Sequence, residues 1–411
     1  MTHSVISPEE ALQTVDTKTE THSEPNTHER RFNRRALLKS GAGGVVIVAG
    51  IGGWRAYDQG VFAVGEGAAF TPWRTWPPSI EQDGPVALVG AAILAANPHN
   101  TQPWLFSVSS IQIDLISDSS RAGGALDPFL REHYLGLGCA IENLVLAASE
   151  NGLNPSVSYH TEIADSSLVA TVSLTANVAT HSDLFDAIPQ RHTNRGPYKQ
   201  VEVPAAMLTS LADTIGDQTN TSVVWFTTEE ERTRVADLII AANKAIDDDD
   251  EQADQTREWF RTSWDDIQKH RDGLTIDTVG VSAMTRFFGK MIPGRLLPLA
   301  VPEGPIKNTP VFGLIVAKES SDRSQQLDAG RIWQRLHLTA TVNGLAAQPV
   351  DSPLVRADRE RSLGLEPTFG ESMQALTPSG WQPLLPFRLG YPKQETELAP
   401  RRSVESVVVT V

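Results

Sequence analysis

A ten-residue segment at positions 95–104, with the sequence AANPHNTQPW, constrains the fold of this 411-residue chain more than any other stretch. Pro98 and Pro103 each fix φ and lack a backbone N–H, so the residues between them cannot continue a helix. The neutral amides of Asn100 and Gln102 lie between these prolines, and an apolar run begins at the final tryptophan. We therefore expect a rigid loop that leads into a strand and holds two amide groups in place.

A second motif, about ninety residues later, concentrates hydrogen-bond donors and positive charge. Arg191, His192, Thr193 and Arg195 supply two guanidiniums, an imidazole and a hydroxyl within five residues. Arginine forks match phosphate oxygens bidentately, so this motif is suited to a phosphate dianion. The two neutral loop amides can form hydrogen bonds with the carbonyls and nitrogens of a flavin ring without placing a permanent charge beside it. Together the motifs indicate a protein that binds flavin mononucleotide, FMN.

The same residues resemble a known family. Asn-Thr-Gln-Pro-Trp at 100–104 is similar to the Asn-x-Gln-Pro-Trp signature of the nitroreductase superfamily, and Arg-His-Thr-x-Arg at 191–195 is similar to its basic phosphate-binding start. The further elements Asp118-x-x-Arg121, Asp127-Pro, Arg131-Glu132 and Arg-Gly-Pro-Tyr at 195–198 resemble the Acg-type subfamily. The match runs from about residue 70 to the C-terminus. A helix expected at 327–345, followed by Ala-Gln-Pro-Val-Asp at 347–351, resembles the helix and flavin-flanking loop of a nitroreductase.

The resemblance implies FMN as cofactor and a set of residues that bind it. The set contains His99, Asn100, Gln102, Arg191, His192, Thr193, Arg195 and, in the C-terminal tail, Arg401 and Arg402, which would complete the phosphate cage. No catalytic side chain or metal is implied, because the flavin itself delivers hydride or electrons. For His99 a structural or flavin-edge role is favoured over proton donation, and His192 has the alternative role of a spacer between the arginines.

The order of the motifs indicates an α+β nitroreductase-like fold that is internally duplicated. Ordinary nitroreductases are homodimers whose chains carry the arginines before the Asn-x-Gln-Pro-Trp loop, whereas here the loop comes first. We therefore predict a fused pseudo-dimer, with half one at 70–181 supplying the ring-side loop and half two at 182–411 supplying the phosphate side. No second copy of the loop follows Arg195, so we expect one FMN per chain.

Apolar periodicity predicts the elements between the motifs. The expected strands are 104–108, 111–116, 168–174, 223–227, 311–317 and 404–410. The expected helices are 86–96, 134–153, 205–215, 229–246 and 324–344. Helices around mainly antiparallel sheets give the α+β class.

Composition excludes several classes of protein. The net charge of −15 argues against general nucleic-acid binding. Cys139 is the single cysteine, so an intramolecular disulfide is excluded, and its place in an apolar helix predicts a buried packing thiol. We expect Asp118, Arg121, Asp127, Arg131 and Glu132 to form one ion-pair cluster.

Residues 247–305 are the least assignable part of the chain. Their first five residues are all acidic, but adjacent carboxylates lack the spacing of a calcium loop and are typical of a solvated helix end. The aromatic residues that follow fit either a lid over the flavin or the packing of a connecting helix pair.

The N-terminus predicts export. Residues 1–29 are polar, and we expect them to form a disordered tail. Within 30–60, Phe-Asn-Arg-Arg-Ala-Leu-Leu-Lys at 32–39 precedes a glycine-rich apolar run and resembles a twin-arginine signal. The resemblance implies the twin-arginine machinery as a partner and a place in the cell envelope or periplasm, with the apolar run as an optional anchor. The alternative is a basic amphipathic tail, and the protein then stays cytoplasmic.

Three functions are compatible with these features. The first is an FMN oxidoreductase that passes electrons from NAD(P)H, or from an envelope donor, to a nitroaromatic, a quinone or a similar small acceptor. The second is an FMN storage or sequestration protein with a closed pocket and little reductase activity. The third is an envelope scaffold that has lost its flavin.

Overall fold

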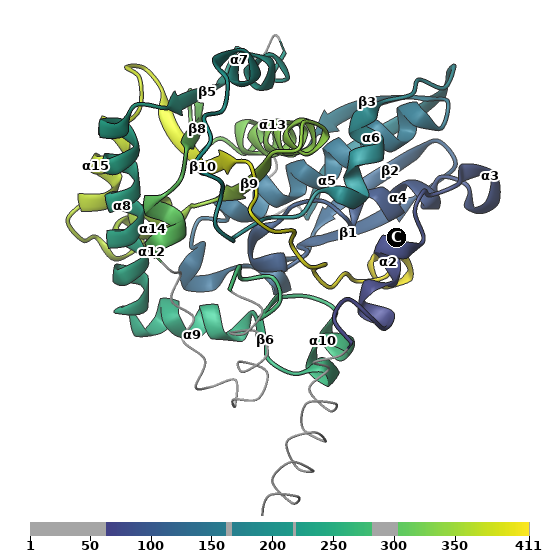
Figure 1. Cartoon of the computed structure of the whole chain (residues 1–411). Coiled ribbons are helices and arrows are strands. Elements are labelled where there is room, and N and C mark those ends of the chain that lie inside the picture. The colour runs from purple at the N-terminus through teal and green to yellow at the C-terminus, as the bar shows by residue number, and fades with distance from the viewer. Residues whose placement is uncertain (1–62, 162–166, 217–218, 282–302, 411) are drawn as a thin grey trace, which may run out of the picture. The chain divides into compact units, whose positions relative to one another are not determined.

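A computed structural model describes residues 63–161, 167–216, 219–281 and 303–410 of the chain (Figure 1). The predicted tail at 1–29 and the predicted signal at 30–60 lie outside these residues, as do positions 282–302 of the predicted lid. Within the described part of the chain, no helix combines the length and hydropathy needed to cross a membrane.

Two four-stranded antiparallel sheets form the framework (Figure 1). The first has the order β1-β2-β4-β3 and consists of β1 (Trp104–Val108), β2 (Gln112–Ser117), β4 (Leu168–Ala176) and β3 (Leu153–Tyr159). The second has the order β5-β8-β10-β9 and consists of β5 (Thr221–Phe226), β8 (Val311–Ala317), β10 (Gln382–Gly390) and β9 (Ala346–Pro349). A short parallel pair joins β6 (Phe260–Arg261) to β7 (Leu274–Thr275).

Two twenty-residue helices pack between these sheets. Helix α5 (Arg131–Glu150) contacts β2, β3 and β4 of the first sheet, and α13 (Arg323–Val342) contacts every strand of the second. Figure 1 shows the two helices side by side near the middle of the molecule. Side chains from both helices and both sheets form one buried apolar cluster. The helix pair therefore links the two sheets into one core.

Shorter helices surround the sheets. They are α2 (Thr71–Arg74), α3 (Ile80–Asp83), α4 (Val86–Ala92), α6 (Asp183–Ala187), α7 (Ala205–Asp213), α8 (Glu229–Asp247), α9 (Asp250–Glu258), α10 (Trp264–His270), α12 (Glu303–Lys307), α14 (Ser352–Leu363), α15 (Thr368–Ala375) and α16 (Val404–Val407). A second apolar cluster lies among α8, α14 and one face of β8. The prediction of an α+β class is confirmed.

Two predicted elements are wrong in part. The helix predicted over 86–96 ends at Ala92, and the chain is extended at Asn97, because a residue before proline disfavours the helical region. The strand predicted over 404–410 is a single helical turn, α16, followed by one bridge between Val408 and Phe106 of β1. Its valine run is β-prone, but the tail meets the sheet only at that point.

The predicted ion-pair cluster is also wrong, because its members divide between two places. Arg121 pairs with Asp272, and Asp118 lies 3.7 Å from the guanidinium of Arg402. Arg131 instead pairs with two acids on the β9–α14 side, as described below. Nearness in sequence therefore does not bring these groups into one cluster.

The acidic run at 247–251 lies at the junction of α8 and α9. The carboxylate of Asp249 caps α9 by accepting a hydrogen bond from the backbone of Gln252 at 3.2 Å. It also pairs with Arg356 and Arg359 of α14, each at 3.0 Å. The run thus fastens α9 to α14. No group of three or more His, Cys, Asp or Glu side chains placed to hold a metal occurs among the described residues.

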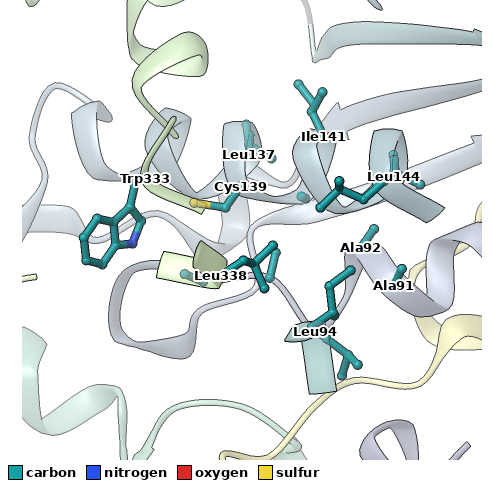
Figure 2. Close-up of a cluster of buried hydrophobic side chains, with 14 of the residues drawn as sticks. Ala91, Ala92, Leu94, Leu137, Cys139, Ile141, Leu144, Trp333 and Leu338 are labelled. Atoms are coloured by element: carbon teal, nitrogen blue, oxygen red, sulfur yellow. The ribbon is translucent and has the colours of Figure 1, made fainter. Parts of the chain in front are cut away.

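Cys139 is buried within the helix pair, beside Trp333 and Leu137 (Figure 2). Its Sγ donates to the carbonyl of Gly330 at 3.2 Å, and burial raises the pKa of the thiol to about 12. We expect iodoacetamide at pH 8 to leave the native protein unmodified and to alkylate it fully in 6 M guanidinium chloride, since the thiolate is the reactive form. Mass spectrometry of the intact chain measures this, and rapid alkylation of the native protein would contradict the buried placement.

Candidate functional site

Two adjoining cavities form the candidate site, one large and mainly apolar, the other small and basic. The larger has a volume of about 640 Å³ and the smaller of about 40 Å³. They share the lining residues Ala96, Asn97, Thr193, Arg195 and Leu274. Because their walls are shared, one ligand with a charged end and an apolar body can extend through both.

The loop between α4 and β1 forms part of both walls. His99, Asn100 and Gln102 all have positive φ, at 47°, 57° and 53°. This left-handed conformation is unfavourable for residues with a side chain, and such strain concentrates at functional sites. The loop is held by the side chain of Asn97, whose Oδ1 accepts a hydrogen bond from the Gln102 backbone at 2.8 Å. The prediction of a rigid non-helical loop is therefore met by a strained, cross-braced segment.

Asn100 lines the smaller cavity and joins its loop to two distant segments. Its Nδ2 donates to the carbonyl of Gly273 at 3.1 Å and to that of Pro400 at 2.9 Å. Its Oδ1 accepts a hydrogen bond from the guanidinium of Arg401. The amide is thus fully engaged in positioning the arginine, and it fixes the tail against the loop.

Gln102 and Arg402 line neither cavity. The Gln102 Nε2 donates to the carbonyl of Arg271 at 2.8 Å, and its Oε1 accepts from the backbone of Arg402 at 2.8 Å. The Arg402 guanidinium donates to the carbonyl of Gln102 at 3.2 Å. Both side chains instead hold the C-terminal tail against the loop. Their predicted contacts with the cofactor therefore have no counterpart in the lining of either cavity.

Three arginines from separate parts of the sequence converge on the smaller cavity. Arg191 donates to the carbonyl of Leu94 at 3.0 Å, and Arg195 donates to that of Thr278 at 3.1 Å. Arg401 is the third. Among the described residues, no carboxylate lies within 4.0 Å of any of the three guanidiniums. Glu397 also lines this cavity, but the three guanidiniums form no ion pair with any described residue.

Burial and mutual repulsion lower the pKa of these arginines. For Arg191 and Arg195, burial lowers the pKa to about 10, and repulsion from Arg388 adds to the effect on Arg195. Burial and the nearby Arg191 bring the pKa of Arg401 well below its usual range. The Nε atoms of Arg191 and Arg401 are buried and have no hydrogen-bond partner within the described residues. Buried cations and orphaned donors both favour an anion in this cavity.

The two histidines of the predicted site are neutral at physiological pH. Burial and Arg195 lower the pKa of His99 to about 4, and burial with two arginines lowers that of His192 to about 3. His99 lines the larger cavity, and His192 lines the smaller one. The His192 ring meets Trp73 edge-on with 4.8 Å between centroids, and the Arg401 guanidinium lies 4.9 Å from the same indole. Trp73, which the sequence motifs did not indicate, thus orders the basic wall.

The larger cavity has walls from both halves of the chain. Its apolar lining includes Leu126, Leu135, Ile239, Ile246, Phe260, Ile276, Trp333, Val350, Val355 and Leu385. Residues from α8, α9, β6 and β7 form one side, and they belong partly to the predicted lid at 247–305. Such a wall would exclude water from a bound aromatic ring.

Glu132, Asp247 and Asp351 are the acids that interrupt this apolar lining, and the sequence motifs placed neither Glu132 nor Asp351 in the site. Glu132 is the second residue of α5, and Asp351 lies directly before α14, yet both line the larger cavity. Asp351 pairs with Arg131 at 2.6 Å, and Arg131 also pairs with Asp358 at 2.8 Å. The earlier signals were the position of Asp351 in the predicted flavin-flanking loop and that of Glu132 in the Arg131-Glu132 element of the family resemblance.

Comparison with known proteins agrees with this picture. No family model matches the chain. Two proteins of Mycobacterium tuberculosis, from strains CDC 1551 and H37Rv, are both named putative NAD(P)H nitroreductase; each is 27% identical to this chain over 304 residues, covering 71% of it and 83% of the relative. The chain is therefore similar in sequence to proteins named as nitroreductases. This similarity supports the predicted resemblance to the superfamily over 71% of the chain.

Solved nitroreductases overlap this chain in part. A nitroreductase from Bacteroides fragilis with bound FMN has 13% identity and a TM-score of 0.34, over 56% of this chain and 99% of that one. The FMN-dependent nitroreductase NfnB from Mycobacterium smegmatis, in complex with NADPH, has 16% identity and a TM-score of 0.32, over 56% and 98%.

Proposed function

We propose that this protein is an FMN-dependent oxidoreductase of the Acg type, which passes electrons from a donor to a small acceptor such as a quinone or a nitroaromatic. One observation carries the proposal. Arg191, Arg195 and Arg401 line a small cavity, where Glu397 is the acid, and form no ion pair with any described residue. This cavity shares walls with one of about 640 Å³. A phosphorylated aromatic cofactor matches both parts, and the larger volume is typical of ligand sites.

Different residues of the site would bind different parts of the cofactor. Arg191, Arg195 and Arg401 would bind the phosphate, and the orphaned Nε donors would gain partners. The strained loop would set the position of the ring, while neutral His99 places no permanent charge beside it. When bound, FMN supplies the transfer of hydride or single electrons. The protein's part is to bind, to orient and to exclude water.

The donor and the cell compartment belong to the same proposal. The names of the mycobacterial relatives favour NAD(P)H as the donor. If the twin-arginine-like signal is used, the protein works in the envelope, where nicotinamide cofactors are scarce and a quinol or a partner protein would be required instead. The fused pseudo-dimer with one FMN per chain, divided near residue 181, is supported by the presence of one four-stranded sheet on each side of that point.

An anaerobic absorbance titration tests the proposed function. Flavin content per chain is measured on the purified protein, and NADPH, NADH and then dithionite are added in turn. About one FMN per chain that bleaches with a nicotinamide donor is the expected result. Flavin that bleaches only with dithionite, even when menaquinol is offered as donor, would indicate storage instead. A colourless protein that takes up no added FMN would contradict the proposal.

A further inference from the structure

The first turn of α5 places a buried acid at the wall of the larger cavity. Glu132 is 8% exposed, and its backbone N–H is fixed by a hydrogen bond of 3.2 Å to the carboxylate of Asp127. The Asp127 carboxylate also accepts from the backbone of His133 at 2.8 Å, so it caps the helix rather than pairing with a cation. The Glu132 side chain therefore has a set position beside the space in which an acceptor would bind.

The carboxyl groups around Glu132 outnumber the buried cations. Arg131 is the buried cation of the group, and Asp127, Glu132, Asp351 and Asp358 all lie within reach of its charge. Asp247 lies elsewhere on the same cavity wall, and Arg361 pairs with Asp358 from the exposed side at 3.2 Å. Carboxylates crowded into a dry site cannot all ionise, so at least one of them retains its proton at neutral pH.

The contacts single out Glu132 as the protonated member. Asp351 and Asp358 accept hydrogen bonds from Arg131, which favour their ionised forms, whereas burial raises the pKa of Asp351. The remaining oxygen of Asp351, Oδ1, is buried and accepts from no fixed donor among the described residues. The Glu132 carboxyl, when protonated, is the donor that this oxygen lacks, and burial together with Asp351 raises the pKa of Glu132 well above its usual range.

We propose that Glu132 is the proton donor to the electron acceptor, and that the acceptor is a neutral, planar ring compound such as a quinone, whose oxygen gains a proton on reduction. This inference rests on the proposed function. For a quinone, the acceptor gains two electrons and one proton as hydride from reduced FMN, and its oxygen gains the second proton from the carboxyl of Glu132. The Glu132 O–H bond breaks, an acceptor O–H bond forms, and water later restores the proton to the carboxylate.

The apolar walls agree with this class of acceptor. Phe260, Ile276, Trp333 and Val350 offer flat or branched apolar surfaces, and the acids are the exception among them. A neutral ring is favoured in such a cavity, and a single hydrogen-bond donor then orients its oxygen. A general acid in this position typically contributes about 10²–10⁴-fold to the rate.

Substitution Glu132→Gln tests the proposal without removing the hydrogen bond to Asp351, because the amide N–H₂ mimics the protonated acid but cannot transfer its proton. With menadione as acceptor we expect the full-length holoenzyme to lose about a hundredfold in kcat. With ferricyanide, which accepts an electron without a proton, we expect no change. In the parent enzyme the menadione rate falls as pH rises through the pKa of Glu132, and that decline is absent from the variant.

Glu150→Gln is the matched control, because Glu150 ends the same helix and contacts Ser182 and His181 outside the cavity. We expect it to preserve both rates. Equal losses with menadione and ferricyanide in Glu132→Gln, or no loss with either, would overturn the proton-donor role. If the parent protein reduces neither acceptor with any donor, the proposed function fails, which is a separate result.

Infrared spectroscopy gives a second reading that requires no turnover. The carbonyl band of a protonated carboxyl should be present at pH 7 in the parent protein, with or without FMN, and absent in Glu132→Gln. The same band should persist in Glu150→Gln. The inference would be overturned, whatever the reductase assays show, if the parent protein had no such band or if the band persisted in Glu132→Gln.

Discussion

Replacing Arg191 and Arg195 together by alanine is expected to lower the affinity for FMN by at least about a hundredfold. Both guanidiniums line the small basic cavity, and neither has a carboxylate partner within the described residues. Hydrogen bonds to a charged group contribute about 1.5–3 kcal/mol each, so two of them account for at least about 3 kcal/mol. Quenching of flavin fluorescence during titration of the apoprotein measures the dissociation constant directly.

Riboflavin and a matched double variant separate phosphate binding from general damage to the site. Riboflavin lacks the phosphate, so its affinity should be the same in the parent protein and in the double variant. Arg234→Ala with Arg257→Ala changes the net charge equally but removes exposed arginines that pair with Glu230 and Asp254. This control should bind FMN normally. Unchanged FMN affinity in the Arg191 and Arg195 variant, or an equal loss of riboflavin, would contradict the assigned phosphate site.

The elements that the sequence predicted well are those whose apolar pattern is set by burial. β8 is buried at all seven positions, and its predicted bounds of 311–317 are those observed. β10 was missed although it is equally central, because Pro383 and Pro386 are unusual inside a sheet. The structure accommodates them with a register shift between Pro383 and Leu385. β3 was missed for another reason: it is a sheet edge with alternate exposed polar residues and a proline.

The candidate site was predictable where its residues are close in sequence. The strained loop at 97–102 and the arginines at 191–195 were found because each motif concentrates several functional groups. The role of Asp351 beside Glu132 was not, because 219 positions separate two residues that only the packing of α14 against α5 brings together. Likewise, Gln102 and Arg402 match a motif, yet their hydrogen bonds go to the backbone of the loop and tail. Residue type identifies a candidate for the site, but only the tertiary contacts determine whether its side chain binds a ligand or the protein backbone.

Replacing Gly330 by alanine is expected to destabilise the protein by about 3 kcal/mol or more. Gly330 lies on α13 where it crosses α5, and a Cβ there would be 2.1 Å from the carbonyl oxygen of Leu135 and 3.0 Å from the Cα of Gly138. The obstacles are backbone atoms, so the two helices would have to separate. Gly138 faces the same restriction, since its Cβ would lie 2.2 Å from the carbonyl oxygen of Leu327. Urea denaturation followed by circular dichroism measures the loss.

Gly370→Ala is the control, because Gly370 is also helical but its Cβ would meet no atom closer than 3.8 Å. There, alanine should preserve stability or raise it by about 0.5–1 kcal/mol, since glycine weakens a helix interior. The effect at Gly330 should also reach the site, because α5 carries Glu132 and Cys139 while α13 carries Trp333, and all three line the larger cavity. Flavin content should therefore fall in Gly330→Ala and remain normal in Gly370→Ala. Equal stability of the two variants would mean that the helices do not approach as closely as the structure places them.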